Sequence, residues 1–197
     1  MIQHPIEHIK KFMALTSGEE NELRAMMVER SMKRGESIRG SVNLGSFAFF
    51  LSKGAARIYY ILKGKEHTID FIFDNGFLVV PHTVLRQAPD TVTIQFLEPS
   101  VIIYVPHLRI KDFLKGAAGL NNHQALIFLN TALIAHNNIL EERMNMMQNH
   151  SSTEKYQWML EHYPRIQERA TITQIASFLG LTKETLYRIR SGKYQTK

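Results

Sequence analysis

The chain opens with two stretches in which apolar positions recur every three or four residues. They read "HPIEHIKKFMAL" and "SGEENELRAMMVE" and end near residue 30. This period is typical of amphipathic helices. Ser17 and Glu20 have the spacing of a capping box, in which two side chains satisfy free backbone N–H groups at a helix start. The pattern therefore predicts two helices, the second capped by Ser17 and Glu20.

Between residues 30 and 106 the period falls to two, and turn glycines recur. Apolar side chains take alternate positions at Ile69, Phe71 and Phe73, and again at Val92, Ile94 and Phe96. Turn signals stand in "KRGE", "SKG", "LKGKE" and "FDNG". Several short strands separated by such turns predict an antiparallel sandwich or roll.

Helical spacing returns after Pro106, first in "LRIKDFL" and then in a long segment from about 121 to 149. One stripe of this segment is a candidate dimerisation seam, made of Leu126, Leu129, Leu133, His136, Leu140 and Met147. A second stripe beside it consists of Phe128, Ala132, Ala135 and Ile139. A helix with two apolar faces needs two partners, so we expect the β-region and the same helix of a second subunit. Burial within a single domain is the alternative.

Two polar residues stand in the predicted seam. Arg143 interrupts it, and His136 either sets the register between paired helices or is a satisfied core or rim histidine. The helical pattern breaks at "NHSST", and a further helix in "STEKYQWMLEHYP" stops at Pro164.

The run "TITQIASFLGLTKETLYRIR", residues 171 to 190, has the pattern of a helix-turn-helix. Ala176 gives a small residue where two helices cross, and Gly180 tolerates the positive φ of the turn. The positions that must face the core of such a module are all apolar, namely Ile175, Leu179, Leu181, Leu186 and Ile189. Thr171 and Gln174 supply a capping box for the first helix, and Thr182 is a suitable N-cap for the second.

The outer face of the second helix carries the side chains that read bases in a major groove. Lys183 and Arg188 can donate to guanine, and Glu184 can accept from cytosine. Hydroxyls and free amides at the helix starts suit phosphate contacts. The candidate DNA-binding residues are Thr171, Thr173, Gln174, Thr182, Lys183, Glu184, Thr185, Arg188 and Arg190. A solvated face of mixed charge is the alternative.

The net charge of +6 is unevenly distributed along the chain, which favours the DNA-binding interpretation over a solvated face. Between Arg165 and Lys197 lie seven basic and two acidic residues, so these 33 residues carry +5 and the first 164 carry +1. Positive charge concentrated in one module favours a polyanionic partner.

The remaining composition limits the class of protein to which the chain can belong. With 197 residues, 44% hydrophobic and 21% charged, the chain suits a globular protein of two small domains. It lacks the roughly 18 to 20 consecutive apolar residues of a membrane span and the apolar block of a signal peptide, so we expect a cytoplasmic protein with no membrane partner. The absence of cysteine excludes disulfides, iron–sulfur clusters and thiolate zinc sites.

Taken in order, these segments resemble the Crp/Fnr family of bacterial transcription regulators. The resemblance rests on "LTSGEENELRAMM", "KRGESI", "FAFFLSKGAARIYYILKGKEHTIDFI", the segment 121 to 149 and "ITQIASFLGLTKETLYRIR". It implies an α+β fold with an antiparallel, cyclic-nucleotide-binding-like β-roll and flanking helices over 1–120. A dimerisation helix over 121–149 and a helix-turn-helix DNA-binding domain over 150–197 would follow. It further implies a homodimer on a roughly palindromic site in double-stranded DNA, with RNA polymerase as another expected partner.

Two departures from the family pattern limit the carry-over. Members that bind cyclic AMP carry a Gly-Glu pair and an Arg that neutralises the phosphate, and "NGFLVVPHTVLRQAPDTVTIQF" has no such pair and no Arg before Val92. Because burying an unpaired phosphate is costly, cyclic AMP is not expected. His82 and Arg86 are the candidate contacts for an unknown small-molecule effector. After Arg190 only "SGKYQTK" remains, so few contacts from a C-terminal wing are expected.

Other functions find little support in the sequence. Nine histidines include His4 and His8, four apart, but no carboxylate follows at a ligand spacing, so no metal and no cofactor is expected. Nucleotide-binding glycine loops and hydrolase motifs are missing, and an enzyme is not expected. The alternative to a DNA-binding regulator is a ligand-sensing β-roll module whose helical C-terminus contacts other proteins.

Overall fold

A computed structural model describes residues 4–11, 14–39, 48–79, 92–106, 109 and 122–193. Within the long helix, side chains are described from residue 130 onward, except at 132, 135 and 136. The predicted short helix "LRIKDFL" and the candidate effector residues His82 and Arg86 lie outside the described residues.

Two antiparallel four-stranded sheets form the β-region, in the orders β1-β8-β3-β6 and β2-β7-β4-β5. The strands are β1 (Val28–Met32), β2 (Ser37–Arg39), β3 (Ala48–Lys53), β4 (Ala56–Leu62), β5 (Lys65–Ile72), β6 (Gly76–Val79), β7 (Val92–Phe96) and β8 (Ser100–Tyr104). Their inner faces enclose one apolar core that includes Phe49, Leu51, Ile94 and Phe96. The predicted antiparallel roll is confirmed.

The alternation predicted in β5 is broken at Ile69. Opposite this residue the pairing of β4 with β5 changes register between Ile58 and Tyr59, so that Ile69 is the extra residue of a β-bulge. Ile69 therefore packs on the roll core, whereas Phe71 and Phe73 pack on the C-terminal helices. The expectation of one shared face for these three residues is wrong, because one extra residue reverses the faces of those that follow.

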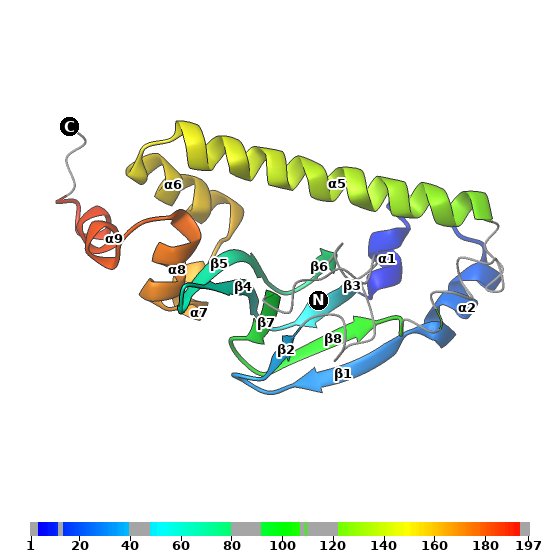
Figure 1. Cartoon of the computed structure of the whole chain (residues 1–197). Coiled ribbons are helices and arrows are strands. Elements are labelled where there is room, and N and C mark those ends of the chain that lie inside the picture. The colour runs from blue at the N-terminus through cyan, green and yellow to red at the C-terminus, as the bar shows by residue number, and fades with distance from the viewer. Residues whose placement is uncertain are drawn as a thin grey trace.

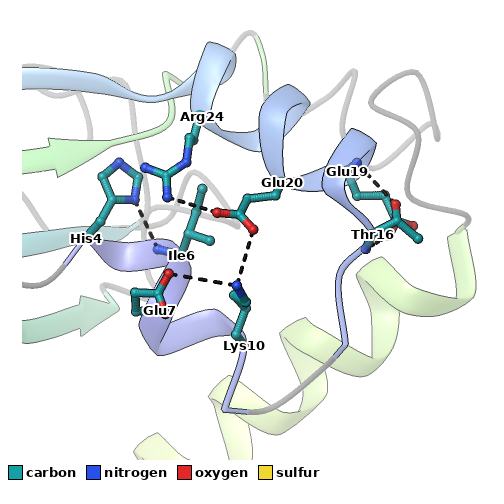
Figure 2. A network of polar contacts seen from close by, with 8 residues as sticks. All are labelled: His4, Ile6, Glu7, Lys10, Thr16, Glu19, Glu20 and Arg24. Atoms are coloured by element: carbon teal, nitrogen blue, oxygen red, sulfur yellow. Dashed lines mark hydrogen bonds and ion pairs between the residues drawn. The ribbon is translucent and has the colours of Figure 1, made fainter.

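Helices α1 (Pro5–Ile9) and α2 (Ser17–Met26) are joined by a small ionic network (Figure 2). Glu20 on α2 accepts hydrogen bonds from Lys10 at 3.3 Å and from Arg24 at 2.9 Å. The capping box of α2 uses Thr16 and Glu19, one residue earlier than predicted. The segment "TSGEE" offers both frames, and Glu20 is engaged by the two basic side chains instead.

From Asn122 to Lys193 the chain is built of helices and short connections. The helices are α5 (Asn122–Asn149), α6 (Ser152–His162), α7 (Ile166–Arg169), α8 (Ile172–Leu179) and α9 (Lys183–Arg190). Helix α5 runs along one side of the molecule, and α6 to α9 gather beside its C-terminal end and one end of the roll (Figure 1). Residues from α6, α7, α8 and α9 share a second apolar core with Phe71 of β5. We call residues 163–193 the helix-turn-helix module.

Arg143, which interrupted the predicted seam on α5, has a partner in this second core. Its guanidinium lies 4.6 Å from the ring centroid of Phe178 on α8. Burial lowers the pKa of this guanidinium. The cation–π contact links α5 directly to the helix-turn-helix module.

Candidate nucleic-acid interface

The hinge between α8 and α9 is built as the sequence predicts. Thr171 caps α8, since its hydroxyl accepts from the Gln174 N–H at 3.3 Å and the Gln174 side chain accepts from the Thr171 N–H at 2.9 Å. Gly180 ends α8 with φ of 65°, a left-handed conformation that favours glycine. Thr182 then caps α9 by accepting from the Thr185 N–H at 3.1 Å.

The apolar side of the module is buried. Ile175, Ala176, Leu179 and Leu186 are almost fully covered, whereas Leu181 and Ile189 are half-buried. Phe178 is also buried and was not among the core positions expected from the sequence. The ring of Phe178 packs edge-to-face against the rings of Phe71 and Tyr163, with ring centroids 5.3 Å apart in both pairs. The module therefore has one covered face and one open face.

Most predicted DNA-binding side chains lie on the open face. Those that are exposed are Thr171, Thr173, Thr182, Lys183, Glu184, Arg188 and Arg190. Gln174 and Thr185 are half-buried and take part in the caps, the Thr185 hydroxyl lying 3.0 Å from that of Thr182. At the start of α9 the pKa of Glu184 is lowered by its own backbone N–H and then by the Thr182 hydroxyl, so its carboxylate is charged at neutral pH.

Sequence reasoning missed Tyr187. Its side chain is 57% exposed on α9, three residues after Glu184 and four after Lys183, on the same face as both. The spacing of three and four residues from Glu184 and Lys183 could have identified Tyr187 from the sequence. The open face of α9 therefore combines three cations, one carboxylate and one aromatic ring.

Ion pairing divides the basic residues of this region. Arg165 pairs with Glu168 at 2.9 Å, and Arg169 pairs with Asp74 and Glu98 of the roll. Across the described part of the chain, no ion pair within 4.0 Å involves the basic residues of α9 and the segment after it, Lys183, Arg188, Arg190 and Lys193. Lys197 lies outside the described residues. The positive charge left for an external polyanion is thus concentrated on and after α9.

The candidate dimerisation residues divide into two groups where they are described. Leu133 and Leu140 are 49% and 48% exposed, and Ile134, Ile139 and Met144 on the same helix are similarly open. Met147 is half-buried, and its methyl carbon lies 2.9 Å from the position of a β-carbon added to Gly180. The side chains of Leu126, Leu129 and His136 lie outside the described residues.

Among the described residues, no group of three or more His, Asp or Glu side chains is placed to hold a metal ion. His4 caps α1 by accepting from the Ile6 N–H at 3.3 Å, and His8 stacks on Phe77 with ring centroids 6.1 Å apart. None of the described helices is both long enough and apolar enough to cross a bilayer.

No model of a protein family matches the sequence. No curated protein matches it either. Solved structures match over most of the chain. FixK2 from Bradyrhizobium japonicum superposes with a TM-score of 0.65 at 18% identity, over 84% of this chain and 83% of that one. A protein from Eubacterium rectale described as a transcriptional regulator of the crp/fnr family gives 0.67 at 17% identity, over 90% and 83%.

CLP, the c-di-GMP responsive global regulator of Xanthomonas campestris, gives a TM-score of 0.67 at 12% identity, over 90% of this chain and 91% of its own. The shared architecture is a β-roll followed by a helix-turn-helix. The chain therefore has the Crp/Fnr-like fold.

Proposed function

We propose that this protein is a sequence-specific DNA-binding transcription regulator that acts as a homodimer on a roughly palindromic site. One observation carries the proposal. The helix-turn-helix module buries its apolar face on the protein, and it leaves Lys183 and Glu184 exposed in the first turn of α9 and Arg188 exposed one turn later. In this motif the first turns of the second helix meet base edges in the major groove.

Each exposed group has a complementary partner on DNA. Lys183 and Arg188 donate to guanine O6 and N7, Glu184 accepts from cytosine N4, and the ring of Tyr187 suits a thymine methyl. Thr171 and Thr173 at the start of α8 offer hydroxyls beside the free N–H groups of a helix start, and such groups suit phosphate contacts. Thr182, Thr185, Gln174 and Arg190 complete the proposed contact set.

The homodimer is supported by the exposed apolar side chains of α5. Nineteen consecutive residues, from Asn122 to Leu140, carry no Asp, Glu, Lys or Arg, and Leu133 and Leu140 are half-exposed in the single chain. Leaving such a row in water is unfavourable, and pairing with a second α5 covers it. Leu126, Leu129, His136 and Met147 remain predicted members of this interface. In the dimer, the α9 helix of each subunit is the recognition helix, and the two recognition helices meet half-sites about 34 Å apart.

The other parts of the proposal follow from the fold. The division into a sensor domain over 1–120, a dimerisation helix over 121–149 and a DNA-binding domain over 150–197 remains a prediction. So do a cytoplasmic location, contact with RNA polymerase, the absence of enzyme activity, and an effector other than cyclic AMP near His82 and Arg86. An effector changes DNA affinity only as far as it binds one arrangement of the module more tightly than another.

Selection of bound sequences from random duplex DNA, followed by mobility-shift titration at several salt concentrations, tests the proposal. We expect a recurring, roughly palindromic site, and affinity that falls with salt at a log–log slope of about −0.9 per phosphate contact. The alternative module, whose helices contact proteins, predicts no enriched sequence. A purified protein that ignores duplex DNA even at low salt refutes the proposal.

A further inference from the structure

Arg169 is a basic residue of the helix-turn-helix module that is turned away from its open face. It ends α7, two residues before the Thr171 cap of α8. Its guanidinium donates to both carboxylate oxygens of Glu98, with Nε at 3.1 Å, and to Oδ2 of Asp74 at 2.6 Å. It also lies 5.0 Å from the ring centroid of Phe73, and the side chain is only 11% exposed.

The two carboxylates stand on turns that are joined to one another. Asp74, in the turn between β5 and β6, also accepts from the Gly54 N–H at 2.8 Å. Gly54 precedes β4 with φ of 117°, and a β-carbon there would lie 2.1 Å from the Ser100 hydroxyl, so only glycine fits. Leu97, next to Glu98 in the turn between β7 and β8, donates to the Ala55 carbonyl at 2.8 Å. Gly54 and Ala55 form the turn between β3 and β4, so three turns are linked. We call the turns at 54–55, 73–75 and 97–99 the turn platform.

Two further polar ties hold the module along β5. The Ser177 hydroxyl on α8 accepts from the Thr68 N–H at 2.9 Å and donates to the Glu66 carbonyl at 3.2 Å. The Tyr163 hydroxyl donates to Oδ1 of Asp70 at 2.8 Å. Burial, followed by the Asp70 charge, raises the pKa of Tyr163, so the phenol remains a donor at neutral pH.

These ties differ in what they constrain. Apolar contacts such as Phe71 on Phe178 are non-directional and tolerate sliding. A guanidinium that binds one carboxylate through two parallel hydrogen bonds has a defined plane and direction. In the described structure, Arg169 binds two turns of the platform and lies two residues before Thr171, the N-cap of α8. It is therefore placed to set the angle at which α8 and α9 leave the roll.

We propose that Arg169 is a positioning residue for DNA binding. Its attachment to Asp74 and Glu98 orients the module on the roll, and in the dimer this determines the separation of the two recognition helices. The inference rests on the proposed function. It assigns Arg169 no contact with DNA, because all of its guanidinium nitrogens already donate to carboxylates within the protein.

The test compares Arg169→Ala with Arg165→Ala. Both variants remove one positive charge from the same module, but Arg165 pairs only locally with Glu168 and is largely exposed. Affinities are measured for a selected palindrome and for versions with the spacer between half-sites lengthened or shortened by one and two base pairs. The wild type and Arg165→Ala are expected to prefer one spacer. Arg169→Ala is expected to lose about fivefold or more of that discrimination, the lower range of coupling between distant sites.

A second variant removes the charges of the roll residues that bind Arg169. Asp74→Asn with Glu98→Gln leaves the module's sequence intact, and both side chains are partly exposed, so folding is expected to persist. The same loss of spacer discrimination supports positioning, because removing two negative charges acts on overall affinity rather than on spacing. Urea unfolding of each variant confirms that the folded protein is compared.

The outcomes separate the two proposals. Wild-type protein that binds no duplex overturns both the DNA-binding function and the role of Arg169. Wild-type protein with a spacer preference that Arg169→Ala and the double variant both retain overturns only the positioning role. A loss of affinity in Arg169→Ala that is equal at every spacer, with a flatter salt dependence, instead marks Arg169 as a phosphate contact and also overturns it.

Discussion

The covered and open faces of the helix-turn-helix module use the same residue types in opposite ways. On the covered face, Phe178 is 1% exposed among other rings, and Arg169 is neutralised by two carboxylates. On the open face, Tyr187 is 57% exposed, and Arg188 has no ion-pair partner among the described residues. The first pair holds the module on the roll, and the second is available to another molecule.

This difference changes what the charge of the module means. Counted along the sequence, all seven basic residues from Arg165 to Lys197 favour a polyanionic partner. In the structure, Arg165 and Arg169 are paired within the protein, and the cations of this region without an ion pair among the described residues are Lys183, Arg188, Arg190 and Lys193. A charge count therefore overstates the number of cations available for the proposed contact with DNA. The salt dependence of binding measures the smaller set.

The largest expected effect comes from breaking the covered face. Phe178→Ala removes a fully buried ring and is expected to lower the free energy of unfolding by about 3–5 kcal/mol. Urea unfolding followed by the fluorescence of Trp158, the only tryptophan and a neighbour of this core, measures the loss. Tyr187→Ala is the matched control, with an expected change within about 0.5 kcal/mol. Similar losses in both variants would contradict the assignment of the two faces.

Arg188→Ala sharpens the comparison from the open side. We expect discrimination between the selected site and scrambled DNA to fall by roughly 1–3 kcal/mol, because a donor to base edges is lost. Since the side chain is exposed, the free energy of unfolding stays within about 0.5 kcal/mol of the wild type. Mobility shift on both DNAs measures the first quantity. Unchanged discrimination would remove Arg188 from the readout.

Gly180→Ala acts on the hinge between α8 and α9, the two helices that carry both faces. An alanine at φ of 65° is expected to cost about 1–2 kcal/mol of stability, and its β-carbon also displaces the Met147 methyl. Gly18→Ala is a control of opposite sign. Gly18 lies in α2 with open space around it, and alanine there is expected to stabilise by about 0.5–1 kcal/mol. Thermal unfolding compares them, and equal shifts would show that the hinge needs no glycine.

The smallest effect tests Tyr187 as a reader of thymine. Tyr187→Ala is expected to weaken binding to the selected site by about 0.8 kcal/mol, the value of one buried methyl-sized group. Replacing the contacted thymine by uracil removes the methyl group from the DNA side. The two changes together then cost no more than either alone. Additive losses would indicate that the ring does not touch that methyl.

The sequence was most informative where function depends on local geometry. The caps at Thr171 and Thr182 and the left-handed Gly180 were predicted from residues within four positions of one another. Local patterns were also the source of two errors. In "TSGEE" two capping frames compete, and the choice of Thr16 over Ser17 depends on the side chains that bind Glu20. In β5 the bulge at Ile69 reversed the alternation.

By itself, the sequence determined the order of elements, the antiparallel roll, the long helix and a helix-turn-helix with a basic second helix. Hydrophobic period, turn glycines and caps are short-range properties, so they can be read along the chain. Only the tertiary structure decided which cations are free, that Phe71 and Phe73 belong to the C-terminal core, and that Arg169 is bound to Asp74 and Glu98. Asp74 lies 95 residues and Glu98 lies 71 residues from Arg169, and no local pattern encodes which distant groups the fold brings within hydrogen-bonding distance.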